Sequence, residues 1–310
     1  MQLFIYSALS PAAQALLLQQ LPAAVRPVFR TDLPEPDQLA AFLAADVLLG
    51  NVPPAWLTGH QPPHLQFWQI DSAGFDQYAG LQLPFPVANM GDYFAWACAE
   101  TIVAGVLSFL RRIPELAVLQ QQREWVGPPL RAKVGLLRHK RVIILGAGGI
   151  GLAVREQLSG FQCQVQLLAR TSPQAQLHSV AELRAALPHT DIVINCLPGS
   201  ADQFFSAELI AAMPPGSLYA SVGRGNTTDE PALVAALQAG KIGAVLDVTA
   251  QEPLPADHPL WTLPNVLLTQ HTGGGQPHED EGKVALFLRN LGHLRSGEPL
   301  ENLVELVRGY

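Results

Sequence analysis

Residues 141–151 read RVIILGAGGIG, and this stretch decides the fold. One charged residue and four aliphatic residues, 141–145, have the pattern of a strand buried on both faces. A glycine turn with the spacing G-x-G-x-x-G follows at once, and residues 152–158 then have helical character. The spaced glycines permit a tight bend, close approach of the backbone to a pyrophosphate, and close packing of helix on strand. The helix N-terminus offers free N–H groups to the same pyrophosphate. We therefore predict a nucleotide-binding βα unit, with contacts from Gly146, Gly148, Gly149, Ile150 and Gly151.

The composition indicates a compact α/β enzyme. Of 310 residues, 48% are hydrophobic and 15% charged, and the net charge is −7. The chain has no block rich in Lys and Arg, so we expect neither nucleic acid nor an anionic membrane as partner. Three scattered cysteines are typical of reduced thiols rather than of a disulfide or metal framework. The first 21 residues lack a basic segment, and the apolar run 101–110 is too short to span a bilayer, so we expect a cytoplasmic protein.

Short apolar runs alternate with helical patterns along the chain, which is typical of parallel sheets with helical crossovers. The fold class predicted is α/β, with two doubly wound parallel-sheet domains. Glycine-rich hinges at 91 and 273–275 predict a substrate-binding domain made of residues 1–91 and 273–310, and a dinucleotide-binding domain at 92–272. The expected strands are 3–6, 25–29, 46–49, 67–70, 85–88, 141–145, 164–168, 191–196, 217–222, 244–248 and 266–269. The expected helices are 11–21, 36–44, 93–112, 180–187, 206–213, 231–239 and 279–294, with residues 120–139 irregular.

Three polar residues follow successive strands of the second predicted domain. Arg224 lies between two glycines after strand 217–222, Glu252 follows strand 244–248, and His271 follows strand 266–269. Ligands of open α/β sheets bind beyond the carboxyl ends of the strands, so we expect all three at the cofactor edge. His can deliver a proton at neutral pH, Glu can orient it, and Arg can hold a carboxylate or polarise a carbonyl. This set suits reduction of a 2-keto acid. Taken singly, each has a plainer interpretation: a structural His, a solvated Glu and an Arg in a turn.

The chain resembles the D-isomer-specific NAD-dependent 2-hydroxyacid dehydrogenase family along nearly its whole length. The motifs that carry the resemblance are AGFD at 73–76, GAGGIG at 146–151, VGRG at 222–225, GKIGAVLDV at 240–248, EPL at 252–254 and PNVLLTQH at 264–271. The resemblance implies a Rossmann cofactor domain inserted in a smaller flavodoxin-like substrate domain. It also implies a homodimer, to which the long apolar helix 93–112 would contribute.

Matched position by position, the resemblance implies specific roles. His271 is the expected acid/base, Glu252 its partner, and Arg224 the substrate-binding arginine. Backbone N–H groups near Ala73 and Gly74 would hold the substrate carboxylate. The further cofactor contacts expected are Leu197, Pro198, Val222 and Asp247, with Asp247 holding the nicotinamide carboxamide.

Two departures from the family pattern leave the reacting groups in place, and a third concerns the cofactor. Gln270 stands where Pro is common, and Ser221 where Asn is common. NAD enzymes carry an acidic residue about 20 residues beyond the glycine turn, to bind the ribose 2′-hydroxyl. This chain has Arg170, Thr171 and Ser172 there, and no Asp or Glu between 157 and 182. An arginine would attract a 2′-phosphate, so we expect NADP(H) to be preferred, with NAD(H) still possible.

The hypothesis is thus hydride transfer between NADP(H) and a small 2-keto acid or D-2-hydroxy acid, with glyoxylate or hydroxypyruvate as the substrate. Two alternatives stay open: a catalytically silent, nicotinamide-sensing binding protein of the corepressor kind, and a formate- or phosphite-type dehydrogenase. We expect no metal site, because His60 and His64 lie in a proline-rich run without acidic partners and are interpreted as a surface loop.

Overall fold

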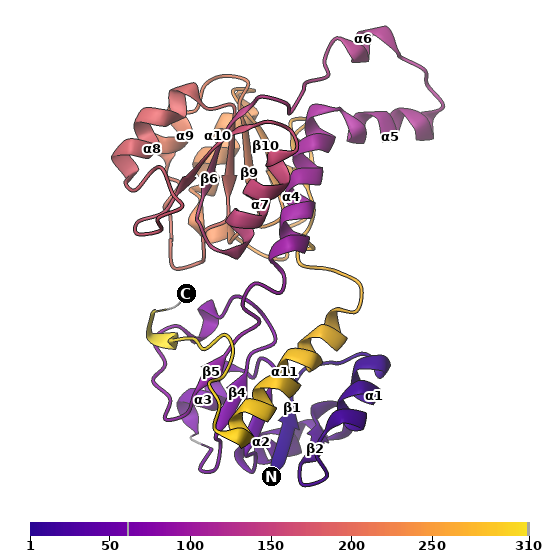
Figure 1. Cartoon of the computed structure of the whole chain (residues 1–310). Coiled ribbons are helices and arrows are strands. Elements are labelled where there is room, and N and C mark those ends of the chain that lie inside the picture. Colours follow the sequence, from indigo (N-terminus) through magenta and orange to yellow (C-terminus); the bar gives the residue numbers. More distant parts are fainter. Residues whose placement is uncertain (61, 309–310) are drawn as a thin grey trace. The chain divides into compact units, whose positions relative to one another are not determined.

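The computed structural model describes residues 1–60 and 62–308 and divides the chain into two compact units (Figure 1). Unit 1 comprises Met1–Tyr93 and Gln276–Tyr310, and unit 2 comprises Phe94–Gly275. These limits lie two and three residues beyond the expected ones at 91 and 272. The difference has a local cause, because the Gln276 side chain donates to the Tyr93 carbonyl (3.3 Å) and the Tyr93 hydroxyl to the Glu279 carbonyl (3.1 Å). Gly273 is instead held in unit 2 by the Asp247 carboxylate.

Unit 1 is built on a five-stranded parallel sheet in the order β2-β1-β3-β4-β5. This is the flavodoxin-like order, in which the chain moves first to one side of β1 and then to the other. Its strands are β1 (Gln2–Ile5), β2 (Arg26–Phe29), β3 (Val47–Leu49), β4 (Phe67–Gln69) and β5 (Val87–Ala88). Its helices are α1 (Pro11–Gln20), α2 (Glu35–Leu43), α3 (Pro54–Gly59) and α11 (Glu279–Ser296).

Successive side chains along the strands of unit 1 point to opposite faces of the sheet, and each face has its own hydrophobic core. Leu3 and Ile5 of β1 point into a cluster that also holds buried residues of α1 and α11. Phe4 points to the opposite face and joins Phe42 of α2 and Leu57 of α3. Within unit 1 the C-terminal helix α11 packs against α1. Among the described residues, no helix is both long and apolar enough to cross a membrane.

Unit 2 is built on a six-stranded parallel sheet in the order β11-β10-β9-β8-β6-β7. A single parallel bridge from Leu177 to Leu168 extends the edge beyond β7. Counting that bridge as a rudimentary strand, the order contains the 3-2-1-4-5-6 arrangement of the Rossmann fold. Its strands are β6 (Arg141–Leu145), β7 (Gln164–Leu168), β8 (Ile192–Asn195), β9 (Leu218–Ser221), β10 (Gly243–Leu246) and β11 (Val266–Leu268). Its helices are α4 (Ala95–Leu110), α5 (Ile113–Gln122), α6 (Pro128–Arg131), α7 (Gly149–Ser159), α8 (Val180–Ala186), α9 (Ala207–Ala212) and α10 (Glu230–Gln238).

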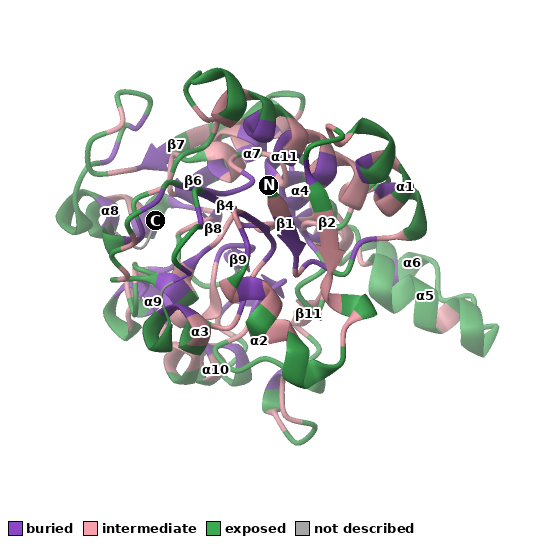
Figure 2. Cartoon of the chain, turned by 90° about the horizontal axis from the view of Figure 1, so that it is seen from below, coloured by how far each residue is buried: buried purple, intermediate pink, exposed green. Residues whose placement is uncertain are grey.

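Both faces of this second sheet are covered by helices. Val142 and Ile144 of β6 join a cluster with α4 and α7, which pack closely on one another. Ile143 and Leu145 point to the other face, into a cluster with α8, α9 and α10. The inner strands β8, β9 and β10 are accordingly buried along their whole length, whereas the edge strands β7 and β11 are partly exposed (Figure 2). Two doubly wound parallel sheets are thus present, as the sequence predicts.

The segment 113–136, which we call the arm, differs from the expectation that residues 120–139 are irregular. It carries α5 and α6 and projects from the rest of unit 2 (Figure 1). Pro114 does not end a helix that runs on from α4. Arg112 adopts a left-handed conformation (φ 58°) that ends α4, and Pro114 then lies in the first turn of α5, where its missing N–H costs nothing.

Candidate active site

The glycine turn joins β6 to α7 and leaves the N-terminus of α7 open at Gly148. Gly146 has φ +102°, and a Cβ there would lie 3.2 Å from the Cys196 carbonyl oxygen. A Cβ on Gly151 would lie 2.2 Å from the Gly146 carbonyl oxygen, so only glycine permits this helix–strand contact. Gly148 precedes α7 and has no atom within 4 Å of its Cβ position. The turn therefore offers an open helix N-terminus, the feature that binds a pyrophosphate.

The turn after β7 is joined to the glycine turn. Gly146 N–H donates to the Leu168 carbonyl (2.9 Å), and the Arg155 guanidinium of α7 donates to the Gln174 side chain (2.5 Å). Arg170 and Thr171 are exposed in this turn, and the Ser172 hydroxyl accepts from Gln174 N–H (3.3 Å). The residues predicted to contact the ribose therefore lie at the same edge of the sheet as the glycine turn.

His271 and Glu252 form a direct pair. The His271 Nδ1 atom lies 2.5 Å from the Glu252 Oε2 atom. The other carboxylate oxygen, Oε1, accepts from Thr249 N–H (3.0 Å). An ionised carboxylate only accepts, so Nδ1 carries the proton of this hydrogen bond. The Nε2 atom is directed away from the pair, and the His271 side chain is 49% exposed. The imidazole is thus oriented by the carboxylate with one nitrogen left for a ligand.

A tight turn after β11 presents His271. Gln270 and His271 both have positive φ angles, 56° and 55°. Proline has φ fixed near −65°, so the Pro common in the family could not adopt the backbone that Gln270 adopts here. The Asp247 carboxylate holds this turn: Oδ1 accepts from the Thr269 hydroxyl (2.6 Å) and from Thr272 N–H (3.0 Å). Oδ2 accepts from Gly273 N–H (3.0 Å), which leaves one acceptor position on this oxygen.

Arg224 follows β9 and precedes a short 3₁₀ turn, Gly225–Thr227. Its guanidinium Nη1 donates to the Gly223 carbonyl (2.8 Å), and its side chain is partly exposed. A Cβ on Gly225 would lie 1.9 Å from the Thr249 carbonyl oxygen, so the arginine turn and the segment before Glu252 are packed backbone to backbone. Unit 2 therefore brings Arg224, Glu252 and His271 to one edge of its sheet, beyond β9, β10 and β11.

Ala73 and Gly74 lie in unit 1, in the loop after β4. Three side chains that the sequence analysis did not single out hold this loop. The Asn89 amide donates to the Ala73 carbonyl (2.6 Å), the Ser72 hydroxyl to the Gly74 carbonyl (2.7 Å), and the Asn51 amide to the Ser72 hydroxyl (3.0 Å). With these carbonyls occupied, the loop is fixed. Asn51, Ser72 and Asn89 lie one to three residues after the neighbouring strands β3, β4 and β5, and this placement of polar residues is the sequence signal that could have identified them.

Comparison with known proteins identifies the family. Residues 103–273 match the sequence model described as "D-isomer specific 2-hydroxyacid dehydrogenase, NAD binding domain". Glyoxylate/hydroxypyruvate reductase A of Salmonella heidelberg is 35% identical over 219 residues, 68% of either chain. Glyoxylate/hydroxypyruvate reductase B of Yersinia enterocolitica is 31% identical over 285 residues, 87% of either chain. The chain belongs to the D-isomer-specific 2-hydroxyacid dehydrogenase family. It is an NAD(P)-dependent oxidoreductase of that family, and the resemblance inferred from its motifs is confirmed.

A solved structure shows that the likeness to this dehydrogenase family extends over both units. The D-isomer-specific 2-hydroxyacid dehydrogenase of Xanthobacter autotrophicus, solved with NADPH and MES, is 27% identical with a TM-score of 0.81. The match covers 100% of this chain and 99% of that one. The fold class predicted from the sequence is therefore confirmed.

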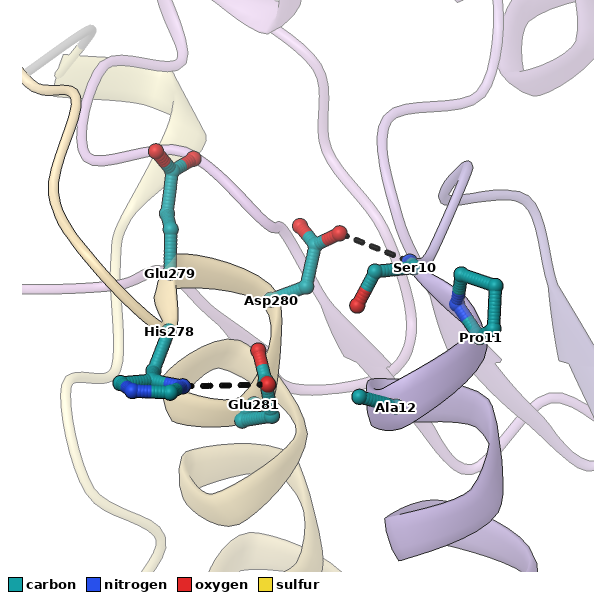
Figure 3. Close-up of a pocket in the computed structure, with 7 residues that line it drawn as sticks. All are labelled: Ser10, Pro11, Ala12, His278, Glu279, Asp280 and Glu281. Atoms are coloured by element: carbon teal, nitrogen blue, oxygen red, sulfur yellow. Dashed lines mark hydrogen bonds and ion pairs between the residues drawn. The ribbon is translucent and has the colours of Figure 1, made fainter.

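A pocket elsewhere in this dehydrogenase contains none of the predicted site residues (Figure 3). It lies in unit 1, between the first turns of α1 and α11, and is lined by Ser10, Pro11, Ala12, His278, Glu279, Asp280 and Glu281. The Asp280 carboxylate accepts from Ser10 N–H (2.8 Å) and so joins the two helix ends. His278 pairs with Glu281 (3.3 Å) within the start of α11.

The described residues contain no group of three His, Cys, Asp or Glu side chains placed to hold a metal ion. His60 and His64 are both exposed and enclose residues 61–63, of which Gln61 lies outside the described residues. The cysteines are free thiols. Burial raises the pKa of Cys98 to about 11 and also raises that of Cys196, which directly follows β8.

Proposed function

We propose that this dehydrogenase reduces a small 2-keto acid, glyoxylate or hydroxypyruvate, with NADPH as the preferred cofactor. The observation that carries the proposal is the His271–Glu252 pair, with Nδ1 and Oε2 2.5 Å apart, at the strand edge that also presents Arg224. A silent dinucleotide sensor has no need of an oriented acid beside a substrate arginine.

His271 acts as the proton donor. When bound, the nicotinamide supplies a hydride to the C2 carbonyl carbon. As the carbonyl π bond breaks, the Nε2–H bond of His271 breaks too, and its proton joins the carbonyl oxygen to give the 2-hydroxy acid. Glu252, bonded to Nδ1, orients the ring and stabilises its positive charge while both nitrogens are protonated.

Arg224 and the Ala73–Gly74 loop orient the substrate. A guanidinium has a planar pair of donors that fits a carboxylate or polarises a carbonyl. In unit 1 the carbonyls of Ala73 and Gly74 already accept side-chain bonds, which leaves the loop's N–H groups as the polar groups to meet a carboxylate.

The dinucleotide is held at the edge that β6, β7 and β8 share. Gly146, Gly148, Gly149, Ile150 and Gly151 hold the pyrophosphate, and Leu197, Pro198 and Val222 contact the nicotinamide half. The remaining acceptor position on Asp247 Oδ2 suits an amide N–H such as that of the carboxamide. Arg170, Thr171 and Ser172 bind a 2′-phosphate, and the Xanthobacter relative was solved with NADPH. NAD(H) remains a second cofactor of lower efficiency.

The relatives support the choice of substrate. Both curated relatives bear the name glyoxylate/hydroxypyruvate reductase. A formate- or phosphite-type dehydrogenase is the weaker candidate, because no additional anion-binding residues accompany Arg224 in the sequence.

A substrate panel tests the proposal. Initial rates of NADPH and NADH oxidation are measured with glyoxylate, hydroxypyruvate, pyruvate and bulkier branched or aromatic 2-keto acids, and in reverse with formate and phosphite. We expect the highest kcat/KM for glyoxylate or hydroxypyruvate with NADPH. A clear preference for a bulky 2-keto acid would refute the substrate, and binding of NADPH without turnover of any 2-keto acid would favour the sensor.

We also propose a cytoplasmic homodimer whose contact is the arm rather than the helix α4. Seven residues of α4 are buried within unit 2. The arm instead exposes large apolar side chains, among them Trp125 (97%) and Leu136 (65%). Several such side chains on a projecting segment are typical of a protein–protein contact, and a second copy of the same chain is the commonest partner.

A further inference from the structure

A buried polar network lies between the segment after β8 and the arginine turn after β9. Asn195, the last residue of β8, and Thr227, the last residue of the 3₁₀ turn, are both 0% exposed. Tyr219 of β9 is also 0% exposed, and Thr228 is 5% exposed. Asn, Thr and Tyr side chains carry polar atoms whose burial is costly unless each finds a partner.

Asn195 is the centre of this network. Its Nδ2 atom donates to the hydroxyl oxygens of Tyr219 (2.8 Å) and Thr227 (2.8 Å). Its Oδ1 atom accepts from Leu197 N–H (3.0 Å). Both hydrogens of the amide and its oxygen are thus used. The Asn195 side chain therefore holds the Leu197 peptide at the predicted cofactor edge. Through the Thr227 hydroxyl it also holds the turn that carries Arg224.

Thr227 completes the connection to the arginine. Its hydroxyl accepts from Asn195 and donates to the Arg224 carbonyl oxygen at 2.6 Å. The carbonyl is fixed, and the Arg224 guanidinium is folded onto the neighbouring Gly223 carbonyl (2.8 Å). The same carbonyl also accepts from Thr227 N–H, at the longer distance of 3.2 Å. The backbone and the buried hydroxyl of Thr227 therefore act together to set the direction in which the arginine side chain leaves the backbone, and the hydroxyl makes the shorter bond.

The two connected segments are also in close contact. A Cβ on Gly223 would lie 2.4 Å from the Leu197 carbonyl oxygen. If the Leu197 peptide moved, the backbone of Gly223, next to Arg224, would have to move with it. Asn195 holds the Leu197 peptide in place through its bond to Leu197 N–H.

We propose that Thr227 and Asn195 are positioning residues for Arg224, with Thr227 fixing the arginine turn and Asn195 linking that turn to the cofactor edge. This inference rests on the proposed function of Arg224 as the substrate arginine. Neither side chain reaches the ligand, since both are fully buried. Their effect is to set the position from which the guanidinium meets the substrate.

The chain provides a matched control in the adjacent threonine. The Thr228 hydroxyl lies 2.5 Å from the Tyr219 hydroxyl and belongs to the same buried network, but it is bonded to Tyr219 and, more distantly, to Asn195 (3.5 Å). The Arg224 carbonyl receives its side-chain bond from Thr227. Thr227→Val and Thr228→Val thus remove the same group one residue apart, and Val keeps the shape of Thr.

The experiment compares Thr227→Val, Thr228→Val and Thr227→Ser in the full-length protein. We measure KM and kcat for glyoxylate with NADPH, Kd for NADPH by fluorescence, and Tm. In Thr227→Val we expect KM for glyoxylate to rise about fivefold or more, the equivalent of one hydrogen bond, with NADPH Kd unchanged. Thr227→Ser restores the hydroxyl and is expected to restore KM. Thr228→Val is expected to keep the wild-type KM, although its Tm falls.

Two results would overturn the proposal: an unchanged KM in Thr227→Val, or an equal rise in both valine variants that tracks their loss of Tm. Crystal structures of the two variants give a readout that needs no turnover. The proposal requires the Arg224 carbonyl to move in Thr227→Val and to stay in place in Thr228→Val. If wild-type protein turned over no 2-keto acid, the proposed function would fail, while these structures would still decide whether Thr227 fixes the turn.

Discussion

In the proposed function, Arg224 holds the substrate through its guanidinium. Lysine keeps the charge but has no planar pair of donors to match a carboxylate. In Arg224→Lys we therefore expect KM for the keto acid to rise by an order of magnitude or more, ~1.5–3 kcal/mol for a charged hydrogen bond, with NADPH Kd little changed. Steady-state kinetics beside a fluorescence titration measure both. A wild-type KM in this variant would mean that Arg224 only shapes its turn.

The three thiols, one buried and two partly buried, lead to a second prediction at the scale of the residue. Burial raises the pKa of Cys98 to about 11 and raises the pKa of Cys163 and Cys196. A raised thiol pKa means that the unreactive protonated form predominates below it, so little thiolate exists near neutral pH. We expect a disulfide reagent at pH 7.5 to react slowly with the folded protein and rapidly after denaturation. Rapid reaction of all three thiols in the folded state would contradict this burial.

The sequence alone predicted the three residues that we propose for catalysis, but not the groups that hold them in position. Arg224, Glu252 and His271 each follow a strand, and strand ends are visible in the sequence because apolar runs stop there. Asn195 is part of an apolar strand, and its role depends on hydroxyls more than 20 residues away. The left-handed turn at Gln270 and His271 is also set by the distant Asp247 carboxylate.

At the scale of the element, we propose that the turn after β7 determines the choice between NADP(H) and NAD(H). A carboxylate in place of Arg170 would repel a 2′-phosphate and accept the hydroxyls of an unphosphorylated ribose. We expect wild type to prefer NADPH by roughly tenfold or more in kcat/KM, from one or two charged hydrogen bonds, and Arg170→Asp to lose that preference. Arg26→Asp, an exposed position in β2 of unit 1, makes the same change in net charge and serves as control. Equal kcat/KM for NADPH and NADH in wild type would refute the proposed preference for NADPH.

Strands and helices could be predicted from the sequence where a single pattern, such as a continuous apolar run, marked their whole length. The strand β7 has the predicted limits, and β8 and β9 each begin one residue later and end one residue earlier than expected. The helix α5 was missed because Pro114 was interpreted as a stop after a single long helix. Proline fits the first turn of a helix as well as the residue after one, and only the left-handed Arg112 distinguishes the two cases.

At the scale of the whole molecule, the exposed apolar side chains of the arm lead to a prediction of the oligomeric state. We expect wild type to sediment as a dimer at micromolar concentration, because exposed apolar side chains gain free energy when buried against a second copy. Replacing Trp125 and Leu136 by Ser is expected to shift the equilibrium toward monomer. Leu18→Ser removes a similarly exposed apolar side chain (53%) from α1 and should leave the dimer intact. A monomeric wild type would contradict the proposed contact.

The central claim is that His271, oriented by Glu252, gives the proton in reduction of a 2-keto acid. The most direct measurement is the NADPH-dependent turnover of glyoxylate by His271→Ala beside wild type, with NADPH Kd measured on both proteins. The account predicts a fall in kcat of about 10²–10⁴-fold, the usual contribution of a general acid, with NADPH Kd unchanged. Nearly normal turnover in His271→Ala would remove His271 from the mechanism and contradict the account.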